Sequence, residues 1–303
     1  MASNNTIWDY VFLARPILLI PVWAFFLLGY WKGGGARFVF TPNFFPTVIA
    51  YTSLISSLYI LNQIADRRTD AINKKHLLIA EGIIPLRAAY LTIFFLLLVT
   101  IIFSIKLPLN VILLMTISFL FGIVYSFPPL KLKAVPFLDF LINGVGYGFL
   151  NFSLGWVTSN KFSNQTVVSA LPYVLAVSAI FVNTTILDIE GDRKCGYLTT
   201  GVLLGRKNTA RLGLLLIVIC LFIAFIIKDY ICLIPAVISF PLFLIAGIKG
   251  DEKFVTLSIR IGGPLLILIV GVVFPYYLLL TLLIFLFLRI YYQKRFGIIY
   301  PSI

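Results

Sequence analysis

Long apolar runs, separated by short charged or glycine- and proline-containing stretches, occupy most of the chain. A hydrocarbon core about 30 Å thick takes roughly 20 residues of helix to cross, and each run approaches that length. The ninth run contains Arg260 and a Gly262-Gly263-Pro264 break, so it could also be re-entrant or a broken helix. The pattern predicts ten crossings, at 11–31, 43–65, 87–106, 108–127, 136–158, 166–188, 210–227, 230–248, 254–272 and 275–293.

Composition supports this assignment. Of 303 residues, 61% are apolar and 12% are charged, and the mean hydropathy is +1.05. Ordinary soluble domains have about 25% charged residues, so a soluble protein is excluded. We expect one polytopic, all-α transmembrane bundle formed by residues 1–303. The start MASNNTIWDY has no basic segment, so no signal peptide is expected.

The net charge of +13 would suggest nucleic acid in a soluble chain, but in a membrane protein the positions of the charges matter more. With a cytoplasmic N-terminus, nineteen Lys and Arg lie on the cytoplasmic side of the predicted crossings and five on the other. This asymmetry predicts a cytoplasmic C-terminus and an even number of crossings. No nucleic-acid partner is expected; the partner is the lipid bilayer.

Six of the eleven acidic residues lie in two cytoplasmic segments. In the first segment, Asn62, Asp66 and Asp70 span about 80° of a helix surface, and Asn73 falls inside that arc. In the second, Asp188 and Asp192 are again four residues apart, while Glu190 points away if the segment is helical. Each segment closes a long apolar run.

Carboxylates stacked at this spacing repel one another and favour a bound cation. Mg²⁺ suits such a place because it takes one or two carboxylates, keeps waters and completes its octahedron with phosphate oxygens. A solvated helix end with balanced charges is the alternative for either segment alone. Basic residues flank both segments and could bind a diphosphate: Arg67, Arg68, Lys74, Lys75, Arg193 and Lys194.

A third cytoplasmic stretch, residues 125–133, reads Tyr-Ser-Phe-Pro-Pro-Leu-Lys-Leu-Lys. Its Pro-Pro pair forces an extended turn, which could present Lys131 and Lys133 to an anion. Taken alone, the stretch is equally typical of an ordinary basic cytoplasmic loop.

Together these segments resemble the UbiA superfamily of intramembrane prenyltransferases, over about residues 11–290. The family's N-x-x-x-D-x-x-x-D signature is matched by Asn62, Asp66 and Asp70, and its D-x-x-x-D signature by Asp188 and Asp192. The stretch 125–133 is similar to members that act on lipids, chlorophyllides and plastoquinone or tocopherol precursors. Many members carry Arg-Pro after the first signature, whereas this chain has Lys74-Lys75-His76-Leu77-Leu78.

The resemblance implies nine transmembrane helices around a cavity, with a cytoplasmic cap that carries both motifs. It implies Mg²⁺-dependent transfer of a prenyl group from a polyprenyl diphosphate to a lipophilic or aromatic acceptor. The expected catalytic residues are Asp66, Asp70, Asp188 and Asp192, and these four with Asn62 are the expected metal ligands. The expected substrate-binding residues are Asn62, Arg67, Asn73, Lys74, Tyr125, Lys131, Lys133 and Lys194.

Two other functions stay open at this stage. A terpene cyclase could use the same metal site, because its acceptor is an alkene of the same molecule. A transporter is a further alternative, although its acidic residues would be expected near the bilayer midplane. The sequence does not identify the acceptor or the prenyl chain length.

Overall fold

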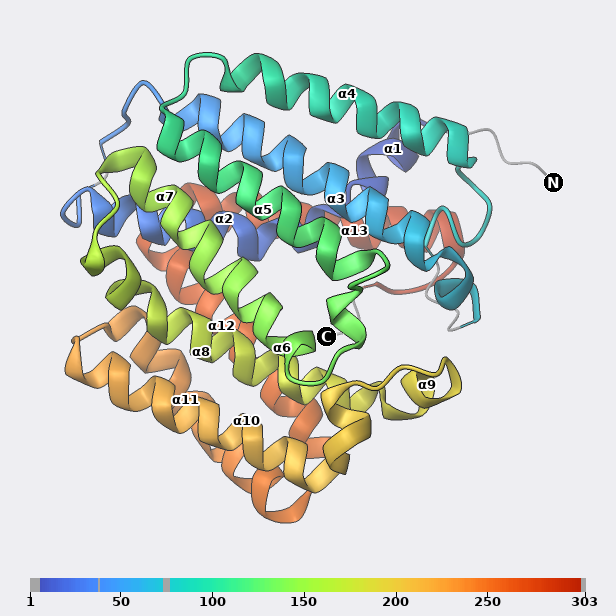
Figure 1. The fold of residues 1–303 in the computed structure, drawn as a ribbon, viewed down its shortest axis with the longest axis vertical. Coiled ribbons are helices and arrows are strands. Elements are labelled where there is room, and N and C mark those ends of the chain that lie inside the picture. The colour runs from blue at the N-terminus through green and yellow to red at the C-terminus, as the bar shows by residue number, and fades with distance from the viewer. Residues whose placement is uncertain (1–5, 38, 73–76, 301–303) are drawn as a thin grey trace. The chain divides into compact units, whose positions relative to one another are not determined.

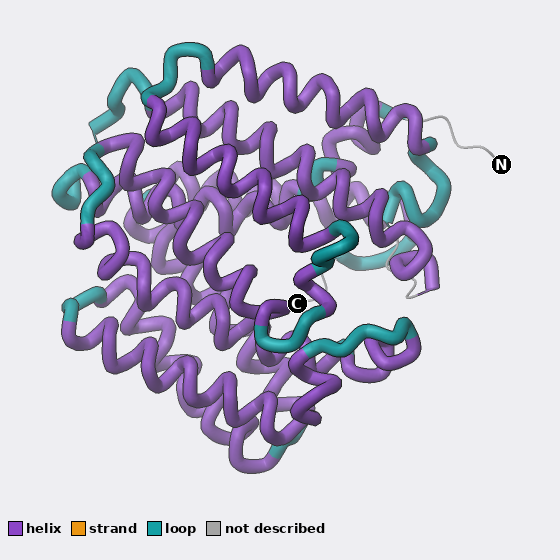
Figure 2. The backbone as a smooth tube through the Cα atoms, in the orientation of Figure 1, coloured by secondary structure: helices purple, strands orange, loops and turns teal. Residues whose placement is uncertain are grey.

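The computed structural model describes residues 6–37, 39–72 and 77–300, and in this part of the chain every regular element is helical (Figures 1 and 2). The α-helices are α1 (Ile7–Leu13), α2 (Pro16–Gly33), α3 (Phe44–Ile72), α4 (Leu86–Ser104), α5 (Leu109–Ser126), α6 (Leu138–Asn143), α7 (Phe152–Ser159), α8 (Asn164–Leu187), α9 (Ile189–Lys194), α10 (Thr200–Ile226), α11 (Tyr230–Lys249), α12 (Glu252–Val273) and α13 (Pro275–Phe296). A 3₁₀ turn, η1 (Leu132–Ala134), and a π-helix, η2 (Gly144–Asn151), complete the set.

Nine of the described helices are long and apolar enough to cross a membrane: α2, α3, α4, α5, α8, α10, α11, α12 and α13. The expected all-α, multi-pass fold is therefore confirmed. The fifth predicted crossing, 136–158, corresponds to α6, η2 and α7, which follow one another without a gap, and none of these three is long enough by itself. The π-helix divides that run because its wider turns interrupt the α-helical hydrogen bonding. The predicted ninth crossing is one unbroken helix, α12, with Pro264 inside it.

The chain forms two compact units. Unit 1 consists of Met1–Ile20, Phe40–Ser126 and Tyr276–Ile303, and unit 2 consists of Pro21–Val39 and Phe127–Pro275. In unit 1, α3 packs beside α4 and α5 (Figure 1). The core of unit 1 joins α1, α3, α4 and α13, with the segment between α3 and α4, through Phe12, Leu13, Ile60, Leu78, Ile79, Ile84, Ala89, Ile93, Leu288 and Tyr292.

An ionic anchor also ties α1 to α13 within unit 1. Asp9 is fully buried and accepts a hydrogen bond from the Tyr291 hydroxyl. The Arg295 guanidinium approaches both carboxylate oxygens at 3.2 Å. Asp9 also accepts a 2.8 Å hydrogen bond from the backbone N–H of Thr6, which closes a capping box at the start of α1. The short helix α1 is thus fixed by charge as well as by packing.

In unit 2, α8 packs against α10, α12 and η2. The crossing of α2 and α7 is a direct contact of backbones at two glycines. A Cβ on Gly29 would lie 1.9 Å from the carbonyl oxygen of Phe152, and a Cβ on Gly155 would lie 1.9 Å from that of Phe26. Gly148 meets the backbone of α8 in the same way. Glycine is required at these crossings because any larger residue would push the helices apart.

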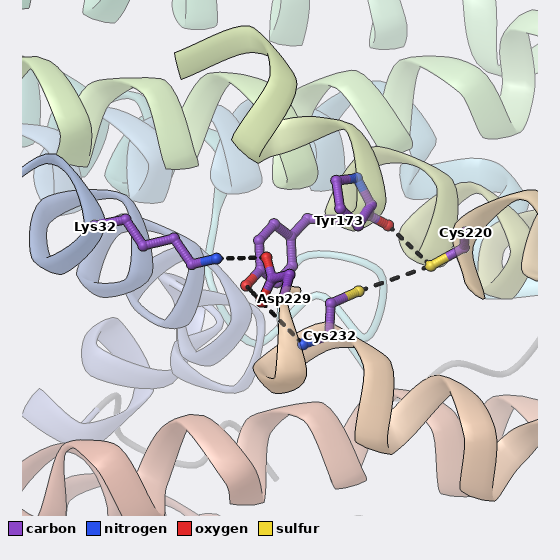
Figure 3. Close-up of polar contacts among 6 residues, drawn as sticks. Lys32, Tyr173, Cys220, Asp229 and Cys232 are labelled. Carbon is purple, nitrogen blue, oxygen red and sulfur yellow. Dashed lines mark hydrogen bonds and ion pairs between the residues drawn. The ribbon is translucent and has the colours of Figure 1, made fainter. Parts of the chain in front are cut away.

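A buried polar cluster joins α2, α8, α10 and α11 in unit 2 (Figure 3). Asp229 forms an ion pair with Lys32 and accepts a 3.0 Å hydrogen bond from the hydroxyl of Tyr173. The sulfurs of Cys220 and Cys232 lie 3.7 Å apart beside it. Buried charges of this kind are tolerated only when they are paired, as they are here.

Candidate active site

The first acidic motif lies in the last turns of α3 in unit 1. Although the apolar run ends near residue 65, the helix continues to Ile72, so Asn62, Asp66 and Asp70 share one face as the spacing predicts. Asn62 Nδ2 donates to Asp66 Oδ2 at 3.1 Å and to Ser126 Oγ at 3.0 Å. Because the amide nitrogen of Asn62 makes both of these bonds, its Oδ1 is the atom that can bind a cation.

Two side chains of α3 fix the position of this motif in unit 1. Gln63 is buried and donates through Nε2 to the carbonyl oxygen of Leu13 at 2.8 Å. Tyr59 donates through its hydroxyl to the carbonyl oxygen of Leu18 at 3.1 Å. Asp70, at the far end of the motif, is buried, with 5% of its surface exposed. The motif is therefore held on a rigid helix and not on a loop.

The second acidic motif lies in unit 2, where α8 ends and α9 begins. Asp188 follows the last residue of α8, and its carbonyl accepts a 2.8 Å hydrogen bond from the backbone N–H of Asp192. This is a helical turn, so the two carboxylates lie one turn apart as the sequence predicts. Asp188 is exposed, and Asp192 Oδ2 accepts a 2.9 Å hydrogen bond from Thr199 Oγ1.

The loop that carries Lys131 is attached to the segment after this motif, within unit 2. Lys131 Nζ donates to the hydroxyl of Tyr197 at 2.5 Å. The backbone N–H of Phe137 donates to Thr200 Oγ1 at 2.7 Å. Asp139 then accepts hydrogen bonds of 2.6 Å from both the backbone N–H and the hydroxyl of Thr200, which caps the start of α10. The loop and the second motif therefore form one connected assembly.

The other predicted site residues lie on several different elements. Tyr125 lies in the last turn of α5 in unit 1, next to Ser126. Arg67 on α3 and Lys194 at the end of α9 are exposed, and Lys133 lies in η1. Asn73 and Lys74 lie outside the described residues.

Four side chains of these assemblies were not predicted: Ser126, Tyr197, Thr199 and Thr200. Ser126 follows Tyr125 in the 125–133 stretch, which the sequence pattern already singles out. The two threonines are typical of a helix start, where the side-chain oxygen of the first residue meets free backbone N–H groups. Nothing in the sequence singles out Tyr197.

The donor set fits Mg²⁺. Each motif supplies two carboxylates, and the first adds an amide oxygen, which are the hard oxygen ligands that Mg²⁺ prefers. In the part of the chain that the structure describes, no three His, Cys, Asp or Glu side chains gather closely enough to hold a metal by themselves. A Mg²⁺ ion here would therefore need oxygens from water or from a phosphate substrate, as is usual for this metal.

Comparison with known proteins relates the chain to plant enzymes. It is 30% identical over 230 residues to the 2-acylphloroglucinol 4-prenyltransferase of Humulus lupulus, a match that covers 68% of this chain and 52% of that protein. It is 32% identical over 164 residues to the probable homogentisate phytyltransferase 2 of Oryza sativa subsp. japonica, which covers 50% of this chain and 42% of that protein. The chain spans about half the length of these curated relatives.

Solved structures show the same fold. A UbiA homologue from Archaeoglobus fulgidus, bound to GPP and Mg²⁺, matches 88% of this chain and 99% of its own length, with a TM-score of 0.64 at 20% identity. The family model of the UbiA prenyltransferase family matches residues 18–252 of this chain, a range that includes both acidic motifs and the loop that carries Lys131. The chain therefore belongs to the UbiA prenyltransferase family.

Proposed function

We propose that this protein transfers a prenyl group from a prenyl diphosphate to an aromatic acceptor, within the membrane and with Mg²⁺. The proposal rests on the positions of the two acidic motifs, in a chain that belongs to the UbiA prenyltransferase family. Each motif closes a long apolar helix, α3 or α8, with its carboxylates one turn apart. Carboxylates at the ends of apolar helices suit a substrate with a charged head and a hydrocarbon tail.

The relatives support the substrate classes. The structure from Archaeoglobus fulgidus holds GPP and Mg²⁺, which supports a prenyl diphosphate as the donor. The names of the two plant relatives specify an acylphloroglucinol and homogentisate, both of which are hydroxylated aromatic rings. An electron-rich ring is also a suitable acceptor on chemical grounds, because it attacks a carbocation readily.

The residues divide the work as follows. Asn62, through its Oδ1, and the four aspartates Asp66, Asp70, Asp188 and Asp192 would hold Mg²⁺. When bound, Mg²⁺ supplies Lewis-acid stabilisation of the charge that develops on the departing diphosphate. Further phosphate oxygens are bound by basic side chains, from Arg67, Lys74, Lys131, Lys133 and Lys194, with Asn73 and Tyr125 as additional polar partners.

The reaction breaks the bond between C1 of the prenyl group and the diphosphate oxygen, and an allylic cation forms. A ring carbon of the acceptor then bonds to C1, and the ring loses a proton. The apolar helices hold the hydrocarbon tail and keep water away from the cation. Without that exclusion, water would capture the cation and give a prenyl alcohol.

The charge asymmetry of the loops supports an active site on the cytoplasmic side. Both acidic motifs and the 125–133 stretch lie on the side that carries nineteen of the 24 Lys and Arg residues in the predicted orientation. A diphosphate made in the cytoplasm would reach such a site directly.

The test uses purified protein in detergent with Mg²⁺, radiolabelled geranylgeranyl diphosphate and, in separate reactions, homogentisate, an acylphloroglucinol and a total lipid extract. Label in a prenylated aromatic product supports the proposal. Label in a hydrocarbon formed without any acceptor would show a cyclase instead. Label in a lipid product alone would contradict the aromatic acceptor, and no release of diphosphate under any condition would contradict the proposal as a whole.

A further inference from the structure

Tyr197 makes contacts that link the second acidic motif to Lys131. Lys131 Nζ donates to the Tyr197 hydroxyl at 2.5 Å and lies 4.3 Å from the centroid of the same ring. The hydrogen bond and the ring both favour a cation at this point. The side chain of Tyr197 is thus a binding place for the Lys131 ammonium.

The backbone of Tyr197 is fixed by the turn that ends α9. Gly196 has φ +73°, a conformation that suits glycine, and the chain reverses there. The backbone N–H of Tyr197 then donates to the carbonyl oxygen of Asp192 at 2.9 Å. Tyr197, which holds Lys131, is therefore joined by a backbone hydrogen bond to Asp192, one of the proposed metal ligands.

The backbone of Lys131 is fixed as well. Its N–H donates to the carbonyl oxygen of Phe127 at 2.8 Å, and its own carbonyl accepts from the N–H of Ala134 at 2.9 Å. Lys131 adopts φ 38° and ψ 55°, the left-handed region that residues with a Cβ rarely occupy. The side chain that extends from this backbone is long and flexible. Among the contacts described above, the one that holds its ammonium end is the contact with Tyr197.

We propose that Tyr197 is a positioning residue: it holds the Lys131 ammonium beside the second acidic motif, where Lys131 binds the diphosphate of the donor. This inference rests on the proposed function. A flexible lysine loses side-chain entropy when it binds an anion, and Tyr197 removes part of that loss before the substrate arrives. Tyr197 therefore acts through Lys131 and contributes to diphosphate affinity more than to turnover.

A double-mutant cycle tests this coupling. The proteins are the wild type, Lys131→Ala, Tyr197→Leu and the double variant, with Tyr230→Leu as a control because Tyr230 is an exposed tyrosine at the start of α11. The measurements are the affinity for inorganic pyrophosphate with Mg²⁺, and KM and kcat for the prenyl diphosphate. Thermal unfolding of each variant reports its folded state.

We expect Lys131→Ala to weaken pyrophosphate binding by roughly 10- to 100-fold, and Tyr197→Leu by roughly 3- to 10-fold with kcat little changed. In the Lys131→Ala background, Tyr197→Leu should add nothing. Tyr197→Phe, which keeps the ring and loses the hydroxyl, should fall between wild type and Tyr197→Leu, and it gives the readout if Tyr197→Leu does not fold.

An equal loss from the tyrosine change in both backgrounds would overturn the inference, because it would show that Tyr197 acts independently of Lys131. An unchanged pyrophosphate affinity in both tyrosine variants would also overturn it. These results leave the proposed function intact if the wild type still transfers a prenyl group. A wild type that neither binds pyrophosphate with Mg²⁺ nor transfers a prenyl group would contradict the proposed function itself.

Discussion

Lys32 at the end of α2 and Asp229 before α11 form an ion pair between residues 197 positions apart in the chain. The side chain of Asp229 is 2% exposed and that of Lys32 is 18% exposed. The hydroxyl of Tyr173 and the backbone N–H of Cys232 also donate hydrogen bonds to the Asp229 carboxylate (Figure 3). The ion pair thus joins α2 and α11 within unit 2. The sequence alone gives no reason to expect that these two helices pair.

Removal of one partner of this pair should destabilise the protein strongly. A buried charge left without its partner costs about 3–5 kcal/mol, so Lys32→Ala should lower the thermal unfolding temperature in detergent substantially. Arg206→Ala is the control, because the Arg206–Glu252 pair is about half exposed and such pairs contribute about 0–1 kcal/mol. Similar small effects of both changes would contradict the assignment of a buried pair.

Under the proposed function, single Asp→Asn changes at Asp66, Asp70, Asp188 and Asp192 should each lower turnover by roughly 100-fold or more, since each removes the charge of a proposed Mg²⁺ ligand. The control is Glu190→Gln, an exposed acidic residue of α9 within the second motif. Circular dichroism and size-exclusion chromatography in detergent check that the variants fold. Near wild-type turnover in two of the four aspartate variants would refute the site.

The stability contributed by Asp9 should depend on pH. Burial by itself would raise the pKa of Asp9, but hydrogen bonds from Tyr291 and Thr6 and the charge of Arg295 outweigh it, so the pKa is lowered. A lowered carboxyl pKa stabilises the fold above the unfolded value of about 4, and this contribution is lost as the pH falls through the folded value. Asp9→Asn should therefore lower the unfolding temperature at pH 7, and the difference from wild type should shrink below about pH 4.

The three cysteines should react at different rates. Cys195 is partly exposed after α9, whereas Cys220 and Cys232 are buried within unit 2. A water-soluble maleimide should label one thiol quickly in the folded protein and all three after denaturation, because a buried thiol is inaccessible to the reagent. Cys195→Ser should abolish the fast reaction, and any fast-reacting thiol in that variant would contradict the burial of Cys220 and Cys232.

A topology reporter fused after Ile303 should show a cytoplasmic C-terminus. The expectation rests on the loop charges, including Arg289, Lys294 and Arg295 at the end of α13. Reporter activity on the opposite side would mean that the orientation, or the number of crossings, differs from the prediction.

Hydrophobic runs predicted the spanning helices well, because apolar length is what the bilayer selects. They predicted the helix ends poorly. The helix α3 continues through the polar residues of the first motif to Ile72. The helix α10 begins at Thr200, and a kink at Gly205, with φ +72°, separates its first turn from the apolar part that the sequence predicts from residue 210. Local hydrogen bonds and caps decide such ends, and hydropathy does not report them.

For the candidate site as well, the sequence predicted the local arrangement of residues and missed their long-range contacts. Spacing placed Asn62, Asp66 and Asp70 on one helix face, since residues four apart share a face in any helix. The contact of Lys131 with Tyr197 joins residues 66 positions apart, and that of Asp139 with Thr200 joins residues 61 positions apart. Contacts of this kind depend on how helices pack, which a single sequence does not specify.

The glycine crossing of α2 and α7 bears on how the protein responds to different membranes. At Gly29 and Gly155 the two backbones touch without intervening side chains, so no rotamer change can let one helix slide or rotate against the other. When a bilayer is thicker or thinner than the hydrophobic length of a helix, the usual adjustment is tilt. The two segments must then tilt together as one rigid body, so α7 follows any tilt that α2 adopts.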